Sequence, residues 1–195
     1  MSSMSVIAVG PFGRAVADRI GALTRDLTDL APVRVLATWR RVPELERELD
    51  ELAHRRRIPW FPVVLEHPAL RIGPVVVPGA GPCHGCYLRR VAQHAPDRAV
   101  GEALARRYAR DPDAGPAGHL PAGALLAASV AVEVARRLSV LPVAEAGRVR
   151  RIDLLTQMTS AGQAVGVHGC VHCGLRRDEG TRSYAGLREV LPWAA

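Results

Sequence analysis

The sequence predicts an α/β fold in which a sheet is covered by helices to make three layers. Three observations predict it. An apolar run at residues 6–9 is followed by a glycine turn and a helical pattern at residues 14–20. A second strand at residues 33–38 is followed by a helical pattern at residues 43–57. Two further strand candidates, residues 58–65 and 70–77, then follow each other directly, and the second is broken at Gly73-Pro74.

The turn after the first strand resembles the fingerprint of a dinucleotide-binding fold. Ala8, Gly10 and Gly13 occupy its three glycine positions, with alanine in place of the first glycine. We therefore expect a reduced Rossmann-like fold and name Gly10 and Gly13 as candidate cofactor-binding residues of a vestigial nucleotide loop. The second strand ends in Thr38 and Trp39, where an acidic ribose ligand would be expected. The fold signal is thus stronger than the nucleotide signal.

The helix predicted at residues 43–57 carries leucines at helical spacing among acidic residues, which is typical of an amphipathic surface helix. Its acidic cluster suits either a metal or catalytic site or a solvated helix face, and we favour the solvated face.

The second half of the chain predicts shorter elements around a loop. Helices are expected at residues 87–94 and 98–110, and a flexible loop rich in glycine and proline at about residues 111–120. An alanine-rich helix at residues 121–138 suits the core or an interface, with the core favoured. A late strand is expected at residues 148–158.

Four cysteines form two CxxC pairs, Cys83 with Cys86 and Cys170 with Cys173, and they are the only cysteines in the sequence. Each pair is spaced to supply two thiolates to a tetrahedral zinc ion. Because 83 residues separate the pairs, the ion would join distant segments as a clasp. Four thiolates leave no open coordination position, so we expect one structural Zn²⁺ per chain.

Two alternatives to this zinc clasp were weighed. The four cysteines could form disulfides instead, but the beginning of the sequence shows no secretory signal, and reducing compartments keep thiols free. A neighbouring histidine, His84, His168 or His172, could also replace one cysteine as a ligand. Four-cysteine ligation is favoured over both.

Composition narrows the classes of function. The chain has 195 residues and a net charge of +7, and all 26 basic residues are arginine. The absence of lysine excludes a Schiff base and a P-loop lysine. Arginine pairs spread along the chain favour solvated faces and ion pairs over an anionic partner. No apolar stretch is long enough to span a bilayer, and we expect a cytoplasmic location with no membrane partner.

Several stretches match a known family in order: residues 8–13, the Pro59-Trp60-Phe61-Pro62 run, residues 73–79, residues 147–156 and both CxxC pairs. On these residues the sequence resembles the ThiF-like (ubiquitin-activating-enzyme-like) partner proteins of YcaO cyclodehydratases, which serve thiazole/oxazole-modified microcin and thiopeptide pathways. In that family the YcaO protein uses ATP to activate the peptide amide, and the ThiF-like protein presents the precursor peptide and activates its partner.

The resemblance implies a non-catalytic adaptor or scaffold of an azoline-forming cyclodehydratase complex, with a structural zinc held by the four cysteines. Its partners would be a YcaO-type cyclodehydratase and a ribosomal precursor peptide, and a homodimer is possible because ThiF-like relatives commonly pair. We expect residues 1–195 to form a single ThiF-like domain. No N-terminal winged-helix peptide clamp fits before residue 6, so a separate protein would supply it, or another surface would bind the peptide, or the chain would act only as a scaffold.

Two other classes of function were weighed. A ThiF-like adenylating or NAD-dependent enzyme needs the nucleotide loop that this sequence has largely lost. A zinc-stabilised nucleic-acid-binding protein would suit the basic charge, but the chain has few aromatic residues to interleave with its arginines. Both are less favoured than the adaptor.

Overall fold

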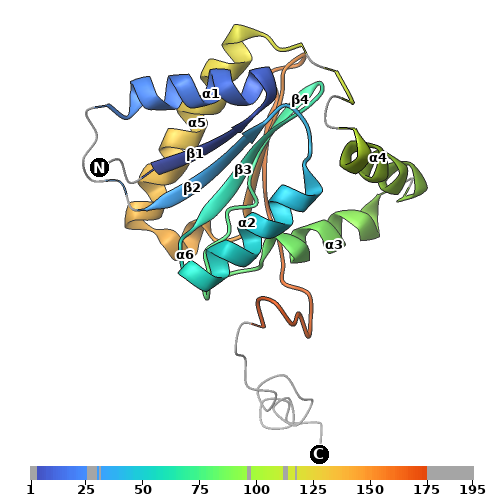
Figure 1. Ribbon diagram of the computed structural model, residues 1–195. Coiled ribbons are helices and arrows are strands. Elements are labelled where there is room, and N and C mark those ends of the chain that lie inside the picture. Colours follow the sequence, from blue (N-terminus) through green and yellow to red (C-terminus); the bar gives the residue numbers. More distant parts are fainter. Residues whose placement is uncertain are drawn as a thin grey trace, which may run out of the picture.

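The computed structural model describes residues 4–25, 30, 32–95, 98–111, 114–116 and 118–174, which form a mixed α/β fold. A six-stranded sheet runs through it in the order of the chain (Figure 1): β1 (Met4–Val9), β2 (Val33–Thr38), β3 (Trp60–Glu66), β4 (Ala69–Ile72), β5 (Arg148–Asp153) and β6 (Thr159–Gln163). The first three strands are parallel, and the next three pair antiparallel. The order leaves β1 at one edge of the sheet.

Helices cover both faces of this sheet (Figure 1). The helices α1 (Gly10–Leu23) and α5 (Pro121–Val140) lie together on one face, and α2 (Pro43–Arg56) and α3 (His84–His94) lie on the other. The helix α4 (Arg98–Arg110) lies beside α2, and the short helix α6 (Pro142–Glu145) follows α5. None of the described helices is both long and apolar enough to cross a membrane.

The larger core lies between the sheet and the pair α1 and α5. Phe12, Val16 and Ile20 are buried along one side of α1, at the helical spacing of four residues. They meet a row of buried alanines on α5, whose small side chains allow the two helices to approach closely. The smaller core, around Leu36 and Trp60, lies under α2. Alternate residues of β2 therefore face opposite helix layers.

Most predicted elements are present, but one strand is shorter than predicted and two elements were not predicted. The strand candidate at residues 70–77 is interrupted at Gly73 and Pro74 as predicted, since β4 ends at Ile72 and the chain turns at Gly73, where φ is 100°. The strand predicted at residues 148–158 ends at Asp153, whose carboxylate accepts hydrogen bonds from the backbone N–H groups of Leu155 and Thr156 and starts a turn. Neither β6 nor α6 was predicted.

The loop predicted at residues 111–120 is described in part, since residues 112, 113 and 117 lie outside the described residues. The others belong to no helix or strand. His119 packs edge-on against Phe12, with ring centroids 5.7 Å apart.

Candidate metal centre

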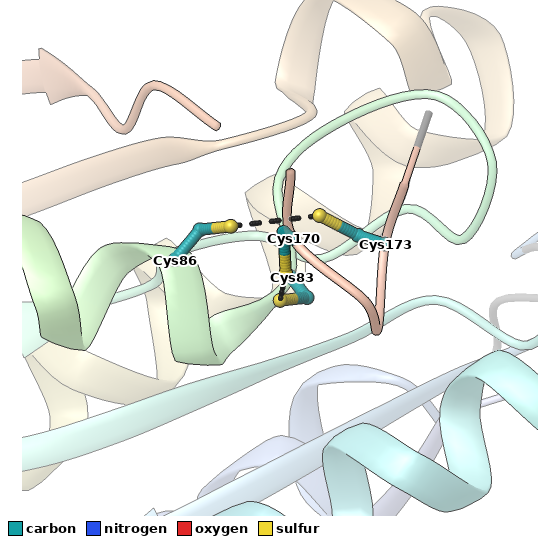
Figure 2. A group of neighbouring side chains, drawn as sticks. All are labelled: Cys83, Cys86, Cys170 and Cys173. Atoms are coloured by element: carbon teal, nitrogen blue, oxygen red, sulfur yellow. Dashed lines mark hydrogen bonds between the residues drawn. The ribbon is translucent and has the colours of Figure 1, made fainter. Parts of the chain in front are cut away.

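The two CxxC pairs meet at the start of α3 although they lie far apart in the sequence (Figure 2). Cys83 is the N-cap of α3, and its carbonyl accepts hydrogen bonds from the backbone N–H groups of Cys86 and Tyr87. The second pair lies in a turn, closed by a hydrogen bond from the N–H of Gly174 to the carbonyl of Cys170. Each tight backbone turn aims its two sulfurs to the same side.

The four sulfur atoms form one compact group. The Sγ atoms of Cys83 and Cys170 are 3.8 Å apart, and those of Cys86 and Cys173 are 3.5 Å apart. All four lie within 4.8 Å of one another, with three of the cysteines buried and Cys173 half-buried. A tetrahedral four-thiolate centre with metal–sulfur bonds of about 2.3 Å has sulfur–sulfur edges of about 3.8 Å. The donor set therefore fits a metal ion.

The same distances exclude a disulfide in this structure, because a sulfur–sulfur bond is about 2.05 Å long and all four cysteines are free.

The protein environment also shifts the pKa values of the thiols. Burial raises the pKa of Cys83 far above its usual range and that of Cys173 to about 11. Burial also opposes ionisation of Cys170, but backbone hydrogen bonds outweigh it and lower its pKa to about 6. Four thiolates can be buried together only with a cation among them.

A buried polar network supports the first CxxC pair from α2. Asp50 Oδ1 accepts hydrogen bonds from the backbone N–H of His84, at 3.2 Å, and from Trp60 Nε1, at 3.1 Å. The His84 imidazole points to Glu46, with Nε2 3.0 Å from Oε2. These contacts fix the backbone that carries Cys83.

The expectation that the acidic residues of this helix are solvated is wrong for two of them. Glu46 is fully buried and Asp50 is 5% exposed, whereas Glu44 and Glu48 are exposed. Burial alone would raise the pKa of Glu46. The hydrogen bond to His84 and the positive charges of Arg41 and Arg71 outweigh burial and hold that pKa well below its usual range.

The three candidate histidines have different surroundings. His84 contacts Glu46, so its imidazole is committed to the network on α2. His172 lies 3.5 Å from Asp50 Oδ2 and 3.1 Å from His54 Nδ1, and these three residues form a second group whose ligand-type atoms lie within 4.8 Å of one another. His168 is exposed. Sequence reasoning missed His54, although the spacing of Asp50 and His54 on a helix was a usable signal.

The glycine loop lies at the carboxyl end of β1, where α1 begins (Figure 1). Gly10 has φ of 71°, and a side chain there would overlap the indole of Trp39. A side chain at Gly13 would overlap the carbonyl oxygen of Ala37 on β2. Both glycines are therefore required by packing within the protein, Gly13 by the close approach of helix and strand.

Trp39 and Arg40 cover this end of the sheet. Trp39 is buried, and the Arg40 guanidinium lies 5.3 Å from the centre of its ring and 4.4 Å from the ring of Tyr108 on α4. The same guanidinium donates to the backbone carbonyls of Tyr108 and Asp111. Aromatic and cationic side chains thus lie at the end of the sheet where a dinucleotide-binding fold receives its phosphates.

The fold and the cysteine group together define a mixed α/β domain whose late segment is tied to the middle of the chain through a candidate metal centre. No protein-family model matches the sequence, and no curated protein matches it either. Solved structures do match.

The structure of the heterocyclase TruD matches with a TM-score of 0.67 and 19% identity, over 89% of this chain and 27% of that chain. A heterocyclase in complex with substrate and cofactor matches with a TM-score of 0.65 and 17% identity, over 88% of this chain and 25% of that one. Escherichia coli MccB matches with a TM-score of 0.53 and 15% identity, over 80% of this chain and 43% of that chain. At these identities the comparisons show a shared fold. The chain spans about a quarter of the length of the heterocyclases.

Proposed function

We propose that the four cysteines bind one structural Zn²⁺ per chain. The sulfur separations match a tetrahedral tetrathiolate centre, and four cysteine ligands leave no position for water or substrate. The ion would tie the turn at residues 170–173 to the start of α3, and so hold the end of the described chain against α2 and α3. Its role is to fix the shape of the protein.

We further propose that the chain is a ThiF-like partner protein of a YcaO-type cyclodehydratase and acts as a non-catalytic adaptor in the formation of azolines on a ribosomal precursor peptide. The observation that carries this proposal is the match of nearly the whole chain to a quarter of the heterocyclase TruD. The family resemblance of the sequence leads to the same role.

Two features of the fold support a non-catalytic role. Trp39 packs on Gly10 at the site of the vestigial nucleotide loop. In addition, β1 lies at the edge of the described sheet, whereas in a Rossmann fold nucleotides bind beside the first strand, where the strand order reverses. Activation of the amide by ATP would therefore belong to the YcaO-type partner.

The arginine pairs support this function over nucleic-acid binding. In the described residues, several paired arginines form ion pairs with carboxylates, among them Arg41 with Glu46, Arg107 with Asp111 and Arg151 with Glu66. Arginines paired in this way are less available to bind the phosphate backbone of a nucleic acid. The pair at residues 176–177 lies outside the described residues.

A homodimer remains a prediction. On α5 the buried side is mostly alanine, whereas Leu125 is 45% exposed and Leu126 is 39% exposed. Analytical ultracentrifugation of the purified chain tests whether this apolar surface pairs two copies.

Reconstitution tests the adaptor role. The YcaO-type enzyme, the precursor peptide and ATP are mixed with and without this chain, and mass spectrometry follows the loss of one water for each ring. We expect ring formation to depend on the chain, and we expect the chain alone to modify no peptide. Ring formation at the same rate without the chain would contradict the adaptor role, and modification by the chain alone would show that it is an enzyme.

A further inference from the structure

A second group of metal-ligand side chains lies beside the cysteines and is not used by the clasp. His172 Nε2 is 3.1 Å from His54 Nδ1 and 3.5 Å from Asp50 Oδ2, and His54 Nδ1 is 3.8 Å from Asp50 Oδ1. Ligands held about 2.0–2.2 Å from a tetrahedral metal ion are separated by about 3.3–3.6 Å. The contacts of His172 with His54 and Asp50, at 3.1 and 3.5 Å, are close to these separations, and one ligand atom from each of the three residues lies within 4.8 Å of the other two.

The local backbone places these groups together. Asp50 and His54 are one turn apart on α2 and lie on the same side of the helix. Asp50 Oδ1 is occupied by donors from Trp60 and His84, which fixes the carboxylate and leaves Oδ2 facing His172. His172 lies between Cys170 and Cys173 in the sequence. The turn formed by these residues therefore places His172 beside α2.

The hydrogen bonds of this group use only part of its polar atoms. His54 Nδ1 lies 2.8 Å from the carbonyl oxygen of Asp50 and can donate a proton there when no metal is bound, so a metal ion bound to Nδ1 would take the place of that proton. His172 Nε2 faces the same nitrogen, and it is 3.5 Å from the carboxylate, at the outer limit of a hydrogen bond. The other ring nitrogen, His54 Nε2, is buried and has no hydrogen-bond partner among the residues that the structure describes.

The group opens into a pocket of about 440 Å³. His54 and His172 line it, together with Arg57, Pro78 and Gly79. A metal ion with three protein ligands keeps a position for a further ligand, and here that position would face the pocket. The arginine in the wall suits water or an anionic group as that ligand.

We propose that Asp50, His54 and His172 bind a second divalent transition-metal ion, distinct from the ion of the four-cysteine clasp, with one coordination position open to the pocket. Two imidazoles and a carboxylate are a ligand set that zinc accepts in sites with an open position. This site does not depend on the adaptor role, since it follows from the geometry of α2 and the turn at residues 170–173.

Metal titration of the purified full chain tests the site. Zinc content after equilibration with excess Zn²⁺ should be about two ions per chain, one of which a mild chelator removes first because it has fewer ligands. Cobalt substitution separates the sites by spectrum, because only the cysteine site gives sulfur-to-metal charge-transfer bands. We expect the second equivalent of Co²⁺ to add no such band.

Substitutions identify the ligands. His54→Gln and His172→Gln should each keep the clasp and hold about one zinc per chain. Loss of an outer-shell partner already costs about 10–100-fold in metal affinity, so loss of a ligand should weaken the second site at least as much. Asp50→Asn keeps an acceptor for Trp60 and His84 and serves as a third variant. His168→Gln, at an exposed histidine of the same segment, is the matched control and should hold two ions.

Three outcomes would overturn the proposal. The first is saturation of the unaltered protein at one zinc per chain. The second is retention of two zinc ions by both His54→Gln and His172→Gln. The third is loss of both ions from His172→Gln while His54→Gln keeps both, which would assign His172 to the clasp.

Discussion

The indole of Trp39 lies directly against the backbone of Gly10, at the point where β1 passes into α1. In a dinucleotide-binding fold this turn lets a phosphate approach the backbone. Here a side chain of the protein makes that approach, so the glycine serves internal packing.

Nucleotide binding is the first prediction. Calorimetric titration of the purified chain with ATP or NAD should give no saturable heat, because Trp39 covers Gly10 and β1 lies at the edge of the described sheet. Saturable binding of one nucleotide per chain would revive the adenylating or NAD-dependent enzyme.

Removal of the Trp39 indole should destabilise the fold. Trp39 is 5% exposed, so Trp39→Ala should lower the free energy of unfolding by about 3–5 kcal/mol. Urea denaturation measures this loss, with Trp39→Phe as the conservative control. An unchanged midpoint for Trp39→Ala would show that the indole is not part of the packing.

Loss of one clasp ligand should unfold or aggregate the protein. Structural zinc contributes on the order of 10 kcal/mol, which is comparable to the whole stability of a domain. Cys170→Ser or Cys83→Ser should therefore lose the metal and the cooperative thermal transition together. Val171→Ser is the matched control, because Val171 is 96% exposed in the same turn. A folded, metal-free Cys170→Ser protein would remove the argument for the clasp.

Removal of one side chain from the buried pair of Glu46 and His84 should destabilise the fold. Glu46 is fully buried and His84 is 1% exposed, so Glu46→Ala leaves a buried polar ring without its partner. We expect a loss of about 3–5 kcal/mol in the free energy of unfolding. Glu48→Ala, at an exposed position of the same helix, should change it little. Equal effects of the two substitutions would contradict the role of the pair.

Glu145 gives a prediction about pH. Its side chain is fully buried, and it contacts Arg137 at 2.5 Å and Arg150 at 2.6 Å. Burial alone would raise the pKa of Glu145, but the hydrogen bonds from both arginines outweigh burial and lower it from the usual 4.5. A lowered pKa in the folded state adds stability above the unfolded-state pKa, and that stability is lost as the pH falls through the folded-state pKa.

Glu145→Gln should therefore reduce stability by about 1–3 kcal/mol near neutral pH, and the difference from the unaltered protein should shrink below about pH 4.5. Paired urea denaturation curves at each pH measure this difference and cancel effects shared by both proteins. A difference that stays constant down to acid pH would show that ionisation of Glu145 contributes nothing.

The sequence was sufficient to predict the features with strong local patterns. The strand, glycine turn and helix around Gly10 were predicted because apolar runs and glycines are read within a few residues. The convergence of Cys83 and Cys170 was predicted because paired CxxC motifs imply a shared ion. Both predictions needed no knowledge of the packing between distant segments.

The features that the sequence did not reveal depend on contacts between distant segments. The strand β6 was missed because all five of its residues are exposed and small or polar, so no apolar alternation marks it. The burial of Glu46 depends on His84, 38 residues further on. His54 belongs to the second group through His172, 118 residues away. Leucine spacing alone showed only which side of α2 is apolar.

Affinity purification of the tagged protein from its native host, with zinc measured on the same sample, tests the adaptor role and the clasp together. We expect recovery of a YcaO-type protein or a ribosomal precursor peptide, together with at least about one zinc ion per chain. Recovery of the chain alone or with nucleic acid would contradict the adaptor role, and a folded sample without zinc would contradict the clasp.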